Sequence, residues 1–418
     1  MSQTIKPETE QQLIDVIEWA ASERAAMSVI GSGTKTALGC AVGVQNTLDL
    51  SGLWGITQYE PSELVLTARA GTPLSDIEIA LAENNQSMAF EPMDTAALFG
   101  LPGNDDGAPI GTIGGMVASG LAGPRRIRQG SVRDHVLGFS AVSGRGEVFK
   151  SGGKVMKNVT GFDLSKLMAG SFGTLAVMSE ITIKVMPAPE KTRTVLVFGL
   201  SNDKAVDVMA DALNSPYEVS SAAHLPQDIA PRSAIPMVAD AGKAVTAIRV
   251  EGPEPSVIAR CQSLRDQLAK GYATEELHSI RSRAFWRALR DVEFFKSVIG
   301  SDMADSHQVW RLSVPPSHGA TVLESLTGTC GGEGLFDWGG GLIWYAMPAQ
   351  PDAAHQTVRQ ALSACGGHAT LMRAGNAVRS QVPVFQPQPA AMAALTGRVK
   401  DGFDPHRILN PGRMYAGL

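Results

Sequence analysis

The sequence predicts an α+β fold in two parts, and two observations carry this prediction. Before residue 190, strand-like runs and glycine turns come in bursts, without the regular strand–helix alternation of a parallel α/β sheet. After Pro187-Ala188-Pro189 the pattern changes, and helical segments separate the strand-like runs. We therefore expect a first domain over 1–190, a second over 191–375, and a C-terminal segment over 376–418 that returns to the first.

The first part begins with an amphipathic helix predicted over 9–24, because Leu13, Val16, Ile17 and Ala20 fall on one helical face. The remaining elements follow from apolar runs bounded by turn residues. They are a strand over 27–30, a strand over 64–68, a helix over 75–84, a hairpin of 136–142 with 147–150, and a strand over 177–185.

The second part contains four strand-like runs, over 192–199, 244–250, 309–314 and 342–347. Helical patterns lie between or after them, over 203–213, 254–268 and 353–365. Four strands with intervening helices predict a separate α+β domain packed on the first. We find no internal repeat in the sequence.

Composition excludes several classes of protein. The chain has 418 residues and a net charge of −5 without a basic run, so a nucleic-acid partner is not expected. No apolar run is long enough for a transmembrane segment, and Met1–Gln12 is too polar for a signal peptide. The cysteines are Cys40, Cys261, Cys330 and Cys365, and their spacing fits neither an iron–sulfur cluster nor a zinc site. Reduced thiols in a cytoplasmic protein are expected.

Two glycine-rich loops are the main candidates for a binding site. The first is Gly31-Ser32-Gly33-Thr34-Lys35-Thr36, and the second is Gly111-Thr112-Ile113-Gly114-Gly115. Glycine lets backbone N–H groups approach a phosphate, so two such loops suggest a ligand with two phosphates, a dinucleotide. Neither loop fits the nicotinamide-type fingerprint or the P-loop. The alternative is a pair of tight turns that need glycine only for positive φ.

A third stretch favours the dinucleotide. Lys157-Asn158-Val159-Thr160-Gly161 precedes Gly170-Ser171-Phe172-Gly173-Thr174, and the strand over 177–185 follows. In this order the three stretches resemble the FAD-binding domain of the vanillyl-alcohol oxidase or p-cresol methylhydroxylase (PCMH) type. The tail from Phe403 to Arg413 is similar to that family's C-terminal signature.

This resemblance implies a two-part PCMH-type FAD-binding domain with a ferredoxin-like α+β cap domain. It implies that Gly31 to Thr36 wrap the FAD diphosphate, that Gly111 to Gly115 and Gly130-Ser131 follow the cofactor toward the flavin, and that Gly173-Thr174 close the pocket. It also implies that the Val177 backbone meets the adenine, and it adds Asn410 from the tail to the cofactor-binding residues. Ala176 departs from the family's glycine by one methyl group. No residue of the second loop suits a covalent flavin link, so non-covalent FAD is expected.

The catalytic residues are less well defined. Hydroxy-acid enzymes of the family carry a His-x-Gly-Asp-Gly-Asn metal stretch that is absent here, and no metal site is expected. His368 as a base with Arg373 as a carboxylate clamp is one interpretation; the other is a strand whose alternate side chains face the interior or a partner. Arg125, Arg126 and Arg128 can face an acidic partner or a substrate carboxylate, or form a solvated rim. The Trp286 and Arg290 pair and the Trp310-Arg311 pair in the cap are typical of packed core edges, with substrate binding as the alternative.

Smaller patterns, including residues 152–161 and 309–315, resemble the FAD-binding E subunits of bacterial glycolate oxidase (glycolate dehydrogenase). That resemblance implies a complex that converts glycolate to glyoxylate. Its other members are a larger FAD-binding subunit and an iron–sulfur subunit, which can bring this chain to the inner face of the membrane. Two alternatives stay open: a stand-alone FAD-dependent 2-hydroxy-acid oxidoreductase, and a cofactor-free scaffold subunit.

Overall fold

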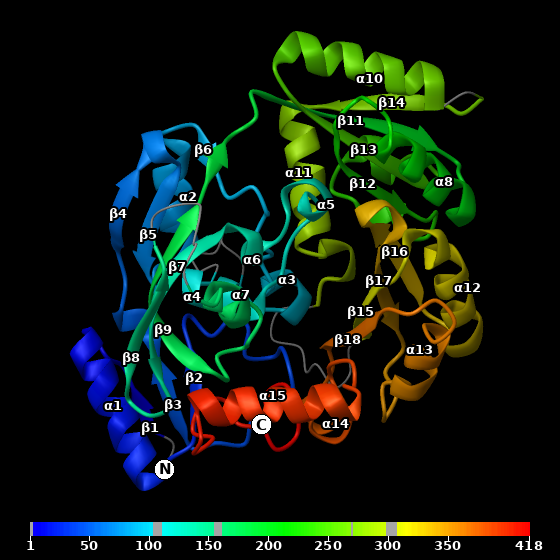
Figure 1. Ribbon diagram of the computed structural model, residues 1–418. Helices are drawn as coiled ribbons and strands as arrows, with labels where there is room; N and C mark the ends of the chain where they lie inside the picture. The colour runs from blue at the N-terminus through cyan, green and yellow to red at the C-terminus, as the bar shows by residue number, and fades with distance from the viewer. Residues whose placement is uncertain (1–2, 103–110, 154–160, 269–270, 298–306) are drawn as a thin grey trace.

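The computed structural model of the chain describes residues 3–102, 111–153, 161–268, 271–297 and 307–418. Figure 1 shows the two parts side by side, with the chain from β1 to β9 in one and the strands from β11 to β18 in the other. The C-terminal helices α14 (Asn376–Gln381) and α15 (Ala390–Phe403) lie below both parts in this view. Residues 157–160 of the third motif lie outside the described residues.

A small parallel sheet opens the first part. Its strand order is β1-β3-β2, and helix α1 (Glu10–Glu23) connects β1 to β2. The predicted helix is confirmed: the Thr9 side chain caps its N-terminus by accepting from the Gln12 N–H, and Leu13, Ile17 and Ala20 are buried. The strands are β1 (Gln3–Ile5), β2 (Met27–Ile30) and β3 (Asn46–Asp49).

A five-stranded antiparallel sheet forms the rest of the first part, in the order β4-β5-β9-β7-β8. The predicted hairpin is confirmed as β7 paired with β8, and the predicted strand over 177–185 is β9. The strands are β4 (Ile56–Glu60), β5 (Val65–Arg69), β7 (Val136–Ser143), β8 (Val148–Gly152) and β9 (Ala176–Lys184). β6 (Gln86–Ser87) and β10 (Met186–Pro187) pair separately.

Short helices surround this sheet, and their apolar side chains complete its core. The predicted helix over 75–84 is α2 (Leu74–Ala82). The others are α3 (Ala96–Phe99), α4 (Ile113–Ser119), α5 (Arg126–Gln129), α6 (Val132–His135) and α7 (Leu164–Met168). The 3-10 turns η1 (Leu50–Gly52) and η2 (Pro61–Glu63) border the strands.

The second part is built on one eight-stranded antiparallel sheet, in the order β14-β11-β13-β12-β16-β17-β15-β18. The expectation of four strands was therefore wrong, because β12, β14, β16 and β18 join the four predicted runs. One of them, β18, is the strand that the second interpretation of His368 and Arg373 predicts. The strands are β11 (Lys191–Phe198), β12 (Val219–Leu225), β13 (Val245–Gly252), β14 (Thr274–His278), β15 (Gln308–Ser313), β16 (Glu333–Asp337), β17 (Leu342–Met347) and β18 (His368–Arg373).

The connectivity of this sheet is that of two ferredoxin-like units joined edge to edge. In each unit the order along the chain is strand, helix, two strands, helix, strand, and the fourth strand lies beside the first. The second strands of the two units, β12 and β16, meet at the middle of the sheet. The fold thus contains a repeat that the sequence does not show.

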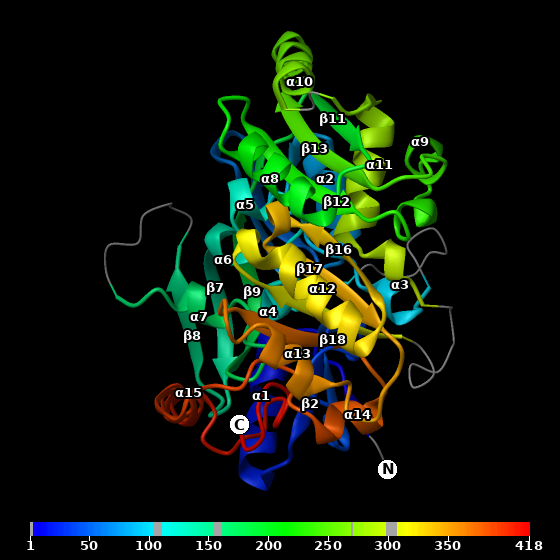
Figure 2. The ribbon, with the colours of Figure 1, turned by 90° about the vertical axis from the view of Figure 1, so that its right-hand side faces the viewer.

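The two faces of this sheet differ. Figure 2 shows α8, α12 and α13 on the outer face. The opposite face shares one apolar core with Leu38, Leu98, Phe99 and Leu121 of the first part, so the two parts are packed together. The helices are α8 (Asn202–Leu213), α9 (Pro236–Ala239), α10 (Glu254–Leu268), α11 (Ser279–Arg290), α12 (Gly319–Cys330) and α13 (His355–Ala361). The 3-10 turns are η4 (Ala230–Arg232), η5 (Glu293–Phe295), η6 (Pro316–His318) and η7 (Trp338–Gly340).

The chain end returns to the first sheet. Met27 donates its N–H to the Ile408 carbonyl, and Asn410 donates its N–H to the Met27 carbonyl. Across the described ranges, none of the helices has the length and apolar character needed to cross a membrane.

Candidate functional site

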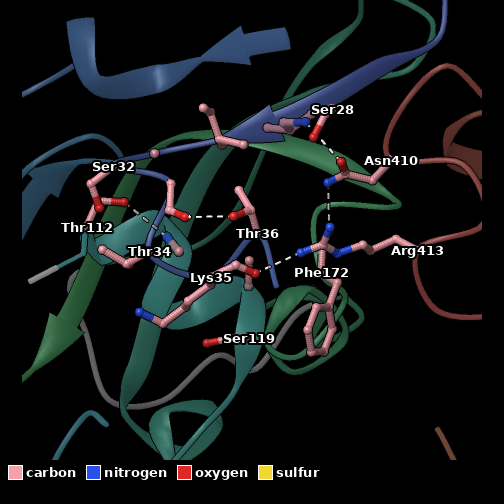
Figure 3. A pocket seen from close by; sticks show the side chains of 16 residues that line it. Ser28, Ser32, Thr34, Lys35, Thr36, Thr112, Ser119, Phe172, Asn410 and Arg413 are labelled. Atoms are coloured by element: carbon pink, nitrogen blue, oxygen red, sulfur yellow. Dashed lines mark hydrogen bonds between the residues drawn. The ribbon is translucent and has the colours of Figure 1, made fainter. Parts of the chain in front are cut away.

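The two glycine loops line one cavity of about 530 Å³. The first loop contributes residues 31–36, the second contributes Thr112 and Gly115, and Phe172, Asn410 and Arg413 complete the wall. Figure 3 shows these side chains converging from the end of β2, the second loop and the C-terminal tail. A neighbouring cavity of about 400 Å³ shares much of this wall and extends to Gly173 and Val177. The combined space therefore runs from the first loop to the start of β9.

Glycine is required where the two loops touch. A Cβ atom built on Gly31 overlaps the Thr112 side chain, and one built on Gly111 lies 2.9 Å from Lys35 Nζ. Gly114 packs its Cα against the Ala70 carbonyl, to which its N–H also donates at 2.8 Å. A side chain at Gly31 or Gly111 would push against the other loop, and one at Gly114 would push the second loop away from Ala70. Gly33 differs, because its Cβ would meet nothing within 4 Å and only its φ of +78° favours glycine.

The C-terminal tail fixes the first loop from the other side. Asn410 Oδ1 accepts from the Val29 N–H at 2.9 Å, and Asn410 Nδ2 donates to the Phe172 carbonyl at 2.8 Å. Arg413 Nη2 donates to the Lys35 carbonyl at 2.7 Å, a bond drawn in Figure 3. One asparagine thus ties β2 to the turn that precedes β9, and one arginine ties the loop to the tail.

Two polar groups of the first loop have no partner. Lys35 Nζ and Ser32 Oγ are shielded from solvent, and neither makes a hydrogen bond to any residue that the structure describes. Burial lowers the pKa of the Lys35 amine, while the carboxylates of Asp94 and Asp291 act in the opposite direction. A buried ammonium without a hydrogen-bond acceptor is costly. An anionic ligand in the cavity would satisfy it, so the residues present fit a diphosphate-bearing group.

Not every predicted cofactor residue lies on these cavities. Ile113 is fully buried in the core of the first part. The Thr174 hydroxyl donates to the Ser171 carbonyl at 2.7 Å, and the Ser131 N–H and hydroxyl both donate to Asp134, the residue that closes the turn after Gly130. These groups are used by the protein itself, so any role for Gly130, Ser131 or Thr174 toward the cofactor would have to come from other atoms.

The structure does not bring His368 and Arg373 together. They stand at opposite ends of β18, where His368 pairs with Ser313 and Arg373 pairs with Val309 of β15, so four positions of β15, or ~13 Å, separate them. His368 is exposed. Arg373 is buried and donates to the carbonyls of His307, Leu98 and Phe295, so its guanidinium is occupied. The interpretation of this pair as a base and a carboxylate clamp has no support in the geometry.

The arginine cluster divides into different roles. Arg125 is neither a solvated rim residue nor free for a partner: its guanidinium makes a two-pronged ion pair with Glu251 at 2.9 and 2.6 Å. Arg126 lies over the Trp338 ring, and Arg128 is exposed. Within the described ranges, no group of three or more histidine, cysteine or carboxylate side chains is arranged to hold a metal ion.

Some residues of the site lie in the sequence motifs described above, but the sequence assigned them no role. Phe172 and Arg413 stand inside the quoted motifs, and only the fold shows that they line the cavity. The unpartnered Lys35 amine had no signal in the sequence, because its lack of a partner depends on segments far apart in the chain.

The fold is that of FAD-binding flavoenzymes of the p-cresol methylhydroxylase type. A solved structure of p-cresol methylhydroxylase with substrate bound matches with a TM-score of 0.67 at 13% identity, over 98% of this chain and 88% of that chain. The family described as FAD binding domain matches residues 1–152.

Two curated relatives identify the family to which the chain belongs within this class of flavoenzymes. The glycolate oxidase subunit GlcE of Escherichia coli (strain K12) is 36% identical over 409 residues, which cover 98% of each chain. The glycolate oxidase subunit GlcD of Bacillus subtilis (strain 168) is 27% identical over 210 residues, 50% of this chain and 42% of that protein. The chain belongs to the family of the glycolate oxidase subunit GlcE.

Proposed function

We propose that this chain is the FAD-binding subunit of a multi-subunit glycolate dehydrogenase and that its two glycine loops hold the FAD diphosphate. The observation that carries the proposal is the buried Lys35 amine, which has no hydrogen-bond partner among the described residues and lies where the two loops meet. A diphosphate between loops that expose backbone N–H groups would neutralise this charge.

The residues around the cavity have distinct proposed roles. Backbone N–H groups of residues 31–35, 111 and 112 would bind the diphosphate, and Lys35 would supply the opposing charge. The N–H groups of Thr36, Ile113, Gly114 and Gly115 already donate within the protein. Asn410 would hold the first loop against the Phe172 turn, so that the loop is preformed before the cofactor binds. The Val177 backbone, at the far end of the second cavity, would meet the adenine. Bound FAD supplies a two-electron acceptor for the oxidation of a hydroxyl-bearing carbon.

We propose that the cofactor is bound without a covalent link. Some relatives attach flavin through histidine or cysteine, and the described residues that line the cavities include neither. Glycine contacts, one amine and backbone groups are sufficient for a non-covalent complex.

The proposed partners are a larger FAD-binding subunit and an iron–sulfur subunit. The names of the GlcE and GlcD relatives support a multi-subunit oxidase. All four cysteines of this chain are free, and they lie apart in the sequence, so a cluster would have to be on another chain. We place the complex in the cytoplasm, at the inner membrane face through its partners.

Purification of the chain alone and together with its two partners tests the proposal. We expect the isolated chain to hold about one FAD, all of it released into the supernatant by acid precipitation. We expect its glycolate turnover to be below about a hundredth of the turnover of the complex, a barrier difference of ~2.7 kcal/mol. Full turnover by the isolated chain would establish a stand-alone oxidoreductase, and a colourless chain in an active complex would establish a scaffold.

Lys35→Met tests the charge at the centre of the site. The affinity for FAD is expected to fall about tenfold to a hundredfold, or ~1.4 to 2.7 kcal/mol, because a charge-assisted contact is lost. The cofactor-free protein is expected to be at least as stable as wild type, since a buried unpartnered charge is removed. Titration with FAD and thermal unfolding of the apoprotein measure the two effects. Lys204→Met, which removes an exposed lysine of α8, should change neither, and a Lys35→Met protein with wild-type affinity would contradict the assignment.

A further inference from the structure

Two arginines from the two parts of the molecule meet at one indole ring. The guanidinium carbon of Arg126 on α5 lies 4.5 Å from the centre of the Trp338 ring, and that of Arg311 on β15 lies 4.9 Å from it. Arg126 is exposed and Arg311 is half-buried, so the site is open to solvent. Figure 1 shows α5 at the junction between the two parts, facing the eight-stranded sheet.

The position of Trp338 is tightly fixed. Its indole Nε1 donates to the Gly123 carbonyl at 3.1 Å, which links η7 of the second part to the segment that leads into α5. Its backbone N–H donates to Asp337 Oδ1 at 2.7 Å. The ring is therefore a fixed platform that both guanidinium groups contact, each by a cation–π interaction, and the charge of Arg126 acts on Arg311.

These two arginines differ from their neighbours, because neither side chain has a hydrogen bond or a carboxylate in ion-pair contact among the residues that the structure describes. The neighbours are paired: Arg249 bonds Glu91 at 2.7 and 2.9 Å, and Arg125 bonds Glu251. The two glutamates are thus already engaged by two other arginines, and the positive charge at the ring is left over.

The carboxyl of Asp337, which acts on Arg311, compensates little of this excess. Burial raises the pKa of Asp337 to about 7, so this group is partly protonated near neutral pH. Burial and the charge of Arg126 both lower the pKa of Arg311, to about 10, and Arg311 still stays cationic. The burial of the Arg311 cation, which has no counter-ion among the described residues, costs free energy that a bound anion would offset.

We propose that Arg126 and Arg311 form a carboxylate-binding site of this chain, on the platform of Trp338, for a small hydroxy acid or oxo acid. The choice of ligand rests on the proposed function. Planar guanidinium groups match the geometry of a carboxylate, and the indole beside them gives a flat apolar floor for a two-carbon or three-carbon acid.

The position of the pair agrees with this role. Ser119, at the end of α4, lines the cavity between the glycine loops, and the chain then runs through Gly123 to α5. The site is complete only when the two parts are docked, because one arginine comes from each. It is separate from Arg373, whose guanidinium is occupied by three carbonyl groups.

Binding of oxalate and glycolate to the purified protein, measured by tryptophan fluorescence and thermal shift, tests the proposal. We expect saturable binding that weakens at least about tenfold in Arg126→Met and in Arg311→Met, with FAD content unchanged. Arg128→Met, on the same helix without a contact to Trp338, should bind as wild type does. Trp338→Phe should abolish the fluorescence change while the thermal shift by oxalate remains.

The outcomes separate this proposal from the proposed function. The carboxylate site is overturned if both arginine variants bind oxalate with wild-type affinity. It is also overturned if the wild-type protein binds inorganic phosphate as tightly as oxalate, or if it binds neither oxalate nor glycolate saturably. Arg126 is exposed, so Arg126→Met keeps the test valid if Arg311→Met does not fold. A colourless protein that still binds oxalate through Arg126 would overturn the FAD proposal and leave this one standing.

Discussion

Gly31→Val is expected to lower the affinity for FAD by at least about a hundredfold, or ~2.7 kcal/mol. A Cβ atom at this position overlaps the Thr112 side chain, and a valine adds two further methyl groups. Thr112 cannot move freely, because its hydroxyl accepts from the Gly115 N–H at 3.2 Å and caps α4. The substitution therefore separates the two loops that are proposed to grip one diphosphate. Titration of the apoprotein with FAD and the ratio of flavin to protein after purification measure the effect.

Gly43→Val is the matched control for this change. A Cβ atom at Gly43 meets nothing within 4 Å, and its backbone does not require glycine. The control protein is expected to bind FAD as wild type does. Gly33→Val is informative as an intermediate case, because it adds backbone strain without a clash and should weaken FAD binding less than Gly31→Val. A Gly31→Val protein that keeps its full yellow colour would place the diphosphate elsewhere.

The parts of the fold that local patterns could predict are those in which neighbouring residues determine the structure. The face of Leu13, Ile17 and Ala20 predicted α1, and the β-branched run after Ala176 predicted β9. The glycine loops were found for the same reason, because close backbone approach restricts side chains at fixed positions. Their assembly into one cavity was a hypothesis that the geometry supports.

The missed strands lack such local signals. β12 contains Ser220, Ser221 and two alanines, and β14 contains two glutamates, so neither has the β-branched and aromatic composition on which strand prediction depends. β16 is interrupted by Gly334. These segments become strands because strong neighbours on both sides, or at one edge, provide hydrogen-bond partners and burial. Because these strands were missed, the two ferredoxin-like units of the second part could not be predicted either.

The site contacts that the sequence could not predict are those between segments far apart in the chain. Asn410 bonds the backbone of Val29, 381 positions away in the chain, and Arg126 meets Arg311 only through Trp338. No spacing rule connects such residues. Conversely, His368 and Arg373 are close in sequence and resemble a catalytic pair, yet they lie at opposite ends of β18, and three carbonyl groups occupy the Arg373 guanidinium.

The tail that carries Asn410 depends on a buried ion pair, and Asp404→Ala is expected to destabilise it by about 3 to 5 kcal/mol. Lys400 Nζ donates to Asp404 at 2.7 Å and to the carbonyls of Thr174 and Leu409 at 2.6 and 3.1 Å. Asp404, fully buried, also accepts from the N–H groups of Ile408 and Leu409. Without the carboxylate, an uncompensated ammonium and two unpaired amides stay buried.

Amide hydrogen exchange can detect this loss at the residues concerned. The amides of Ile408 and Leu409 should exchange about a hundredfold faster or more, because 1.4 kcal/mol of local stability corresponds to a factor of ten. FAD should bind more weakly as well, since Asn410 follows directly and holds the first loop. Asp401→Ala is the matched control: its exposed ion pair with Arg407 should contribute less than about 1 kcal/mol. If both alanine variants exchanged at the wild-type rate, the clamp would not stabilise the tail, and the proposed link from Lys400 through Asn410 to the glycine loop would fail.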